Sequence, residues 1–145
     1  MGRTVVAPQP ILKNGDYRHM ARRDAVVWER FIERYGGAYI GVAYDVALGG
    51  ISVDHDPADA EYADAYRYST ALKIDAVLFT SSHALIVEVR PWATVSALGS
   101  VLAYTLVAQR DRLLAQPFQP AIVCEGIQLD VRWCCDQIGV VIFEV

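Results

Sequence analysis

The sequence is poor in the residues from which several common kinds of site are built. Its three cysteines, Cys124, Cys134 and Cys135, lack metal-ligand spacing and make a poor disulfide framework, because their number is odd and two are adjacent. Its three histidines are scattered, without the spacing or the cysteine partner of a zinc site. Neither a glycine-rich phosphate loop nor a nucleophile elbow is present. We therefore expect reduced cysteines in a cytoplasmic compartment, and no histidine metal site.

A secretory signal and a convincing membrane span are also missing from the sequence. The first residues contain no apolar core of useful length. Residues 91–109 are uncharged for long enough to raise the question of a membrane span. This run contains proline, glycine, serine, threonine and glutamine, so a helix buried inside a domain is the better interpretation. We expect no membrane partner.

Length and composition favour one folded domain after a short irregular arm. The 145 residues are 54% hydrophobic and 21% charged, which is typical of a protein that can bury a real core. Residues 1–20 show no clear periodicity and contain Pro8, Pro10 and Gly15. We therefore predict an irregular N-terminal arm over residues 1–20 and a single α/β domain over residues 21–145.

The charges are distributed unevenly along the chain. The net charge of −4 gives no general attraction to polyanions. Residues 1–34 nevertheless carry seven lysines and arginines against four acids, whereas residues 45–64 carry six acids and no lysine or arginine. Any contact with nucleic acid should therefore be local, through the basic N-terminal part, and sensitive to salt.

The first predicted element is an amphipathic helix over residues 22–37. Its apolar side chains fall on one face at helical spacing, at Ala25, Trp28, Phe31, Ile32 and Tyr35. Gly36 supplies a stop signal and Asp24 a plausible N-cap. Glu29 lies beside the apolar face.

The remaining pattern predicts a mixed sheet flanked by helices. A strand candidate in residues 38–50 ends at a glycine pair, and residues 52–70 form an acidic excursion that could contain one short helix. A hairpin follows, with strands near 72–79 and 84–90. A helix near 93–110, a strand at 120–125, a helix near 128–138 and a last strand at 140–145 complete the order α-β-β-β-α-β-α-β.

Charged residues interrupt the two apolar runs of the predicted hairpin. A buried carboxylate costs several kcal/mol unless it is paired or holds a metal, so Asp75 and Glu88 need a reason. Side chains alternate across a strand, so Glu88 and Arg90 share a face of one strand, and Lys73 and Asp75 share a face of the neighbouring strand. If the hairpin aligns the two strands, the four charged groups converge on one patch. Two such carboxylates beside each other suit Mg²⁺ or Mn²⁺ better than Zn²⁺.

These residues and their order resemble the PD-(D/E)XK nuclease superfamily, which has a restriction-endonuclease-like core. Asp75 and the "EVR" of residues 88–90 correspond to its motif, and "VWERF", "YDVALGG" and "EVRPWATVSALGSVLAY" resemble small bacteriophage-encoded members. The resemblance implies that Asp75 and Glu88 bind Mg²⁺ or Mn²⁺, with Glu29 as a possible third ligand. The sequence departs from the motif at Arg90, which replaces its lysine. It departs again at Ser100, which replaces a common glutamine.

The departure at Arg90 matters for chemistry. Arginine can hold a phosphate but stays protonated, so it cannot relay a proton. Lys73 is a candidate for a migrated replacement, a hypothesis that rests on strand alternation alone. Plainer readings stay open: Asp75 could pair with Lys73 or Arg90, Arg90 could be only a salt-bridge partner, and Glu29 could be an ordinary surface acid. Glu88 could occupy a solvated edge position.

Two functions follow as hypotheses. The first is a metal-dependent nuclease that cleaves DNA in a host cytoplasm, with activity impaired by the change at Arg90. Trp92, directly after the charged strand, is a possible substrate contact. The second is a non-catalytic scaffold with the same fold, acting in a bacteriophage virion or its assembly through protein partners or a homo-oligomer.

Overall fold

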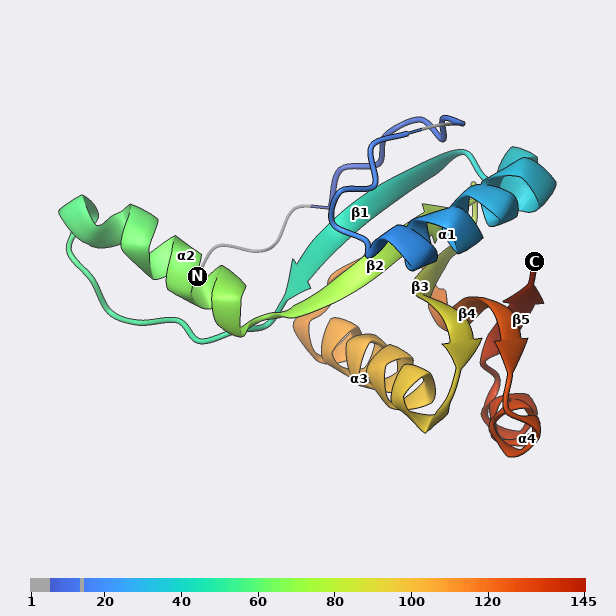
Figure 1. The fold of residues 1–145 in the computed structure, drawn as a ribbon. Coiled ribbons are helices and arrows are strands. Elements are labelled where there is room, and N and C mark those ends of the chain that lie inside the picture. The colour runs from blue at the N-terminus through green and yellow to red at the C-terminus, as the bar shows by residue number, and fades with distance from the viewer. Residues whose placement is uncertain (1–5, 14) are drawn as a thin grey trace.

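The protein has a mixed α/β fold, which a computed structural model describes for residues 6–13 and 15–145 (Figure 1). The described residues form a five-stranded mixed sheet and four α-helices. In chain order these are α1 (Arg22–Tyr35), β1 (Gly41–Leu48), α2 (Ala60–Thr70), β2 (Leu72–Phe79), β3 (Ala84–Ala93), α3 (Val95–Asp111), β4 (Phe118–Ile127), α4 (Leu129–Ile138) and β5 (Val141–Glu144). Two short 3₁₀ helices, η1 (Gly36–Ala38) and η2 (Pro57–Asp59), precede β1 and α2.

The strands lie in the order β1-β2-β3-β4-β5. The first three are antiparallel, and β3, β4 and β5 are parallel to one another. This change of direction follows from the connections. A tight turn closed by the Thr80 amide on the His83 carbonyl, at 2.8 Å, joins β2 to β3. Helices α3 and α4 carry the chain back for the parallel pairs. The predicted hairpin and the two parallel crossovers are confirmed.

The helices cover both faces of the sheet. Apolar residues of α1 pack against one face, and α3 and α4 pack against the other. Along β3 the side chains alternate between these layers, with Leu85 and Val87 under α1 and Ala84 and Ile86 under α3. Because both of its faces are buried, β3 reads in sequence as a continuous apolar run. Charged side chains within this run are therefore exceptional.

Three details differ from the sequence prediction or complete it. The acidic excursion contains an eleven-residue helix, α2, which the predicted order of elements lacks. The N-cap of α1 is Ala21, so the prediction of Asp24 as N-cap is wrong; Asp24 lies in the first turn. The described part of the predicted arm, 6–13 and 15–20, forms only one isolated bridge, from Gln9 to Val42. Residues 1–5 and 14 of that arm lie outside the described residues.

Residues 91–109, the uncharged run, form the end of β3 and most of α3. The part in α3 is the predicted helix buried inside a domain. Its Ala97, Val101 and Thr105 are buried against the sheet. Among the residues that the structure describes, no helix combines the length and the apolar character needed to cross a membrane.

Strands β1 and β2 depart from the regular pleat at one level of the sheet. Tyr44 and Ala76 are paired and lie under α1, but the next pair, Val46 and Ile74, lies under α3. Asp45, between these pairs, has a φ of 48°, in the left-handed region that non-glycine residues seldom adopt. The side-chain alternation is therefore interrupted at Asp45 and at Asp75, which lies opposite.

Helix α1 is fixed to the sheet by Trp28. Its ring is fully buried and stacks on Phe31, with ring centroids 4.9 Å apart. Its Nε1 donates a hydrogen bond of 2.9 Å to the hydroxyl of Tyr44 on β1. A buried indole N–H needs such a partner. This bond ties α1 to the sheet next to the interruption at Asp45.

Replacing Tyr44 with phenylalanine should lower the free energy of unfolding by about 1–3 kcal/mol, because it leaves the buried Trp28 N–H without its acceptor. Denaturant titration measures the change. Tyr62→Phe, at a 72% exposed tyrosine, is the matched control and should change stability by less than about 0.5 kcal/mol. Equal stability of the Tyr44 variant and the wild type would show that the hydrogen bond does not stabilise α1.

Candidate functional site

Asp75 and Glu88 meet where β2 and β3 separate. The pairing of the two strands ends at Ala76 and Val87. Beyond this last pair of residues, the Val89 amide of β3 donates a hydrogen bond of 2.8 Å to Asp75 Oδ2 rather than to a carbonyl of β2. The Asp75 carboxylate thus replaces a bond of the sheet, which holds it at the opening between the strands. This explains why an acid interrupts β2 at this level.

Glu88 is buried in the centre of the sheet, with 1% of its surface exposed. Its position on β3 pairs with Ile122 of β4, under the layer of α3 and α4. Its Oε1 forms an ion pair of 2.6 Å with Arg90 Nη2. Its Oε2 is buried and has no well-formed hydrogen bond to another described residue. Such an oxygen costs about 1–3 kcal/mol, so its presence calls for an explanation.

Burial and mutual repulsion shift the acidity of both carboxyl groups. Burial, followed by the nearby charge of Asp75, raises the pKa of Glu88 to about 8, although Arg90 and the Tyr104 hydroxyl lower it. Burial also raises the pKa of Asp75, against the opposing effects of the Val89 amide and Arg90. Both carboxyl groups therefore keep their protons to a higher pH than exposed acids do when no cation is bound. Perturbed acids of this kind are typical of functional sites.

Asp24 is a third acid near this pair, and the sequence did not indicate its place. Its charge raises the pKa of both Asp75 and Glu88. Burial raises the pKa of Asp24 itself, and the charge of Arg90 opposes that rise. Asp24 precedes Trp28 by four residues, so it continues the buried face of α1 past the edge of the core. That four-residue spacing is the signal in the sequence from which the place of Asp24 could have been predicted.

Glu29, the predicted third metal ligand, lies in different surroundings. Its carboxylate is beside Tyr17 and Tyr44, and its charge helps burial to raise the pKa of both tyrosines. The charges that shift the pKa of Asp75 and Glu88 include Asp24 and do not include Glu29. The structure thus brings Asp24, rather than Glu29, to the pair.

Lys73 also points away from Asp75 and Glu88. Its Nζ lies 4.5 Å from the centre of the Tyr68 ring and donates to the Ala71 carbonyl at 3.3 Å. The hypothesis that Lys73 shares a face with Asp75 assumed strict alternation, which is interrupted in this part of β2. Arg90 is accordingly the cation that acts on both acids.

Basic and aromatic residues lie near these charged residues, either along the chain or in space. Arg22 and Arg23 are exposed in the first turn of α1, next to Asp24. His19 Nε2 lies 3.1 Å from the Asp75 carbonyl oxygen. Trp92 is exposed, and its ring covers Gly126 so closely that a side chain there would collide with it. Phosphates and bases are ligand groups that side chains of these kinds commonly bind.

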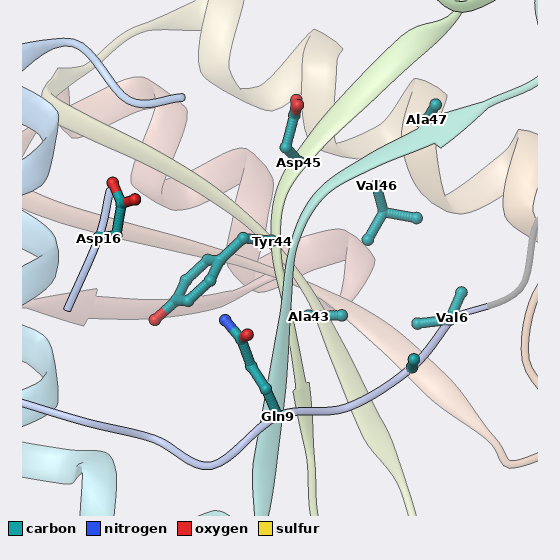
Figure 2. Close-up of a pocket in the computed structure, with 9 residues that line it drawn as sticks. Val6, Gln9, Asp16, Ala43, Tyr44, Asp45, Val46 and Ala47 are labelled. Carbon is teal, nitrogen blue, oxygen red and sulfur yellow. The ribbon is translucent and has the colours of Figure 1, made fainter. Parts of the chain in front are cut away.

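A cavity of about 510 Å³ lies elsewhere, along the edge of the sheet (Figure 2). It is bounded by β1 around Tyr44–Ala47 and by Val6, Gln9 and Asp16. The carboxylates on its wall are already engaged: Asp16 pairs with Arg18, and Asp45 accepts a bond of 2.5 Å from Tyr68. Neither Asp75 nor Glu88 lines this cavity.

The oxygen ligands of Asp75 and Glu88 suit a hard cation that takes only some of its ligands from the protein. In the described part of the chain, no three His, Cys, Asp or Glu side chains are grouped to hold a metal ion by themselves. Mg²⁺ commonly takes only one or two carboxylates and completes its shell with water and phosphate oxygens. Glu88, with its unbonded Oε2 and its carboxyl group within electrostatic reach of Asp75, fits that mode of binding.

Comparisons of the chain with protein-family models, with curated proteins and with solved structures found no match.

Proposed function

We propose that this chain is a metal-dependent nuclease-like protein of the PD-(D/E)XK type, which hydrolyses phosphodiester bonds in DNA. One observation carries the proposal: Glu88 is buried beside Asp75 at the separation of β2 and β3, with one carboxylate oxygen unbonded. A hydrophobic core has no need of two adjacent acids there, whereas a cation between them would offset their burial and their repulsion. The restriction-endonuclease-like order of elements, with α2 as an insertion, belongs to the same proposal.

Each residue then has a defined task. Asp75 and Glu88 would hold Mg²⁺ or Mn²⁺, which would supply Lewis-acid polarisation of the phosphodiester and a lower pKa for a water molecule. The Arg90 guanidinium, 35% exposed and fixed by Glu88, stabilises negative charge that develops on the phosphate. Arg90 stays protonated, so the water must lose its proton to another group.

A direct test compares the wild type with the double variant Asp75→Ala, Glu88→Ala. Plasmid DNA is incubated with each purified protein in Mn²⁺, in Mg²⁺ and in chelator. We expect the wild type alone to nick or linearise the plasmid, and only when the cation is present. Equal residual cleavage by both proteins would contradict the proposal, since it would mark the activity as a contaminant.

A second candidate is a non-catalytic scaffold that acts in a bacteriophage virion or its assembly. The ion pair between Arg90 and Glu88 favours it, because the guanidinium already neutralises the carboxylate that a cation would need. Calorimetric titration with Mn²⁺ separates the candidates. Metal binding that disappears in the double variant supports the nuclease in a host cytoplasm, and absence of binding supports the scaffold.

A further inference from the structure

An acidic arm projects from the body of the molecule. We give this name to residues 51–70, which run from Ile51 through η2 and α2 (Figure 1). Helix α2 packs against η2 and has no comparable packing with another described element. The arm is held at its base, where the Ile51 amide donates to Thr70 Oγ1 at 2.8 Å and Arg67 Nε donates to the Gly49 carbonyl at 3.2 Å.

The acidic arm exposes several apolar and aromatic side chains to solvent, which is unfavourable for a segment that contacts nothing. Ala63 is its only buried side chain among the described residues. Its exposed large side chains are Ile51, Val53, Tyr62, Tyr66 and Tyr68. Exposed side chains of this kind gathered on one short segment favour a protein contact, and tyrosine is especially common in such contacts. Twenty residues can supply one side of an interface of ordinary size.

The charge of the arm indicates the chemistry of its partner. It contains five acids against the single cation Arg67, whose Nε is bonded to the base of the arm. None of the described lysines and arginines forms an ion pair with these acids, which are Asp54, Asp56, Asp59, Glu61 and Asp64. The partner surface should therefore be basic.

The same chain carries a basic surface of that kind. Arg22 and Arg23 are exposed at the start of α1 and form no ion pair with another described residue. Arg30 and Arg34, further along α1, are engaged by Glu125 and by the Glu144 carbonyl. The start of α1 is thus the free basic end of the helix, and the acidic arm of the same molecule does not reach it by any ion pair.

We propose that the acidic arm docks on the start of α1 in a second copy of this chain. When each copy offers both surfaces, the exchange is reciprocal and closes into a two-fold dimer. The tyrosines would supply buried contact area and the opposite charges would set the orientation. The inference does not rest on the proposed nuclease activity, because it uses neither Asp75 nor Glu88.

Sedimentation velocity of the full chain tests the dimer. We expect the wild type to self-associate, with affinity that falls at least about tenfold between about 50 mM and about 300 mM salt. The arm variant Asp54→Lys, Asp56→Lys, Asp64→Lys and the helix variant Arg22→Glu, Arg23→Glu should each be monomeric. An equimolar mixture of the two should form a heterodimer, because both contacts are then again between opposite charges.

Several outcomes would overturn the proposal. These are a wild type that stays monomeric at about 200 µM, an arm variant that associates as the wild type does, and a mixture that contains only monomers. Circular dichroism establishes that the variants are folded. If the charge variants unfold, the double variant Tyr62→Ala, Tyr66→Ala replaces them, because it keeps the net charge. The proposal then requires this variant to lose association in the same way.

Discussion

Replacing Glu88 with glutamine is expected to lower the rate of Mn²⁺-dependent DNA cleavage by at least about 10³-fold. The amide has the same shape but offers no negative charge to the cation, and it also removes the charged partner of Arg90. Initial rates on plasmid DNA measure the effect. Glu125→Gln, at an exposed glutamate of β4, is the matched control and should cleave at the rate of the wild type. Full activity of the Glu88 variant would remove Glu88 from the proposed site.

The same substitution should raise stability at alkaline pH. The pKa of Glu88 is raised to about 8 in the folded protein from its ordinary value of 4.5 in the unfolded chain, so the folded protein binds the additional proton. Its stability is therefore full below about pH 4.5 and falls as the pH rises towards 8. Glutamine cannot ionise, so the advantage of the variant over the wild type should be larger at pH 8 than at pH 5. Thermal unfolding without added metal measures it, and an advantage that does not depend on pH would contradict the shift.

Much of the fold could be predicted because local patterns agree with the final packing. Helix α1 shows its buried face at helical spacing, and β2 and β3 are short apolar runs on either side of a tight turn. Helix α2 was less predictable, because the sequence indicated only that the acidic excursion could contain one short helix. Ala63 is its only buried residue, so the sequence carries no apolar stripe from which the helix could be recognised.

The site was predictable only where burial conflicts with charge. Asp75 and Glu88 are conspicuous because acids are rare inside apolar runs. The partners of this pair depend on geometry that the sequence does not contain. The phase of α1 directs Glu29 towards Tyr17 and Tyr44 and brings Asp24 to the pair. The interrupted pleat at Asp75 invalidates the strict alternation that suggested Lys73.

Arg90 and Lys73 can be separated by experiment. Arg90→Ala is expected to lower DNA cleavage by about 10²–10³-fold, because it removes the positive charge that acts on both acids and on the substrate phosphate. Lys73→Ala should leave the rate within about twofold, since its Nζ faces the Tyr68 ring. Initial rates in Mn²⁺ measure both. A loss at Lys73 as large as that at Arg90 would assign the task of the motif lysine to Lys73.

Arg90→Lys is the more informative variant, because it restores the motif residue in place. The ammonium is a compact charge, whereas the guanidinium pairs tightly with Glu88 Oε1 at 2.6 Å. Weakening that pair should free Glu88 for the cation, so we expect the lysine variant to bind Mn²⁺ at least as tightly as the wild type and to cleave faster. Calorimetry and cleavage rates measure the two effects separately. Tighter metal binding without cleavage would contradict the proposed nuclease activity while leaving the metal site in place, whereas a gain in both would identify Arg90 as the residue that limits a working nuclease.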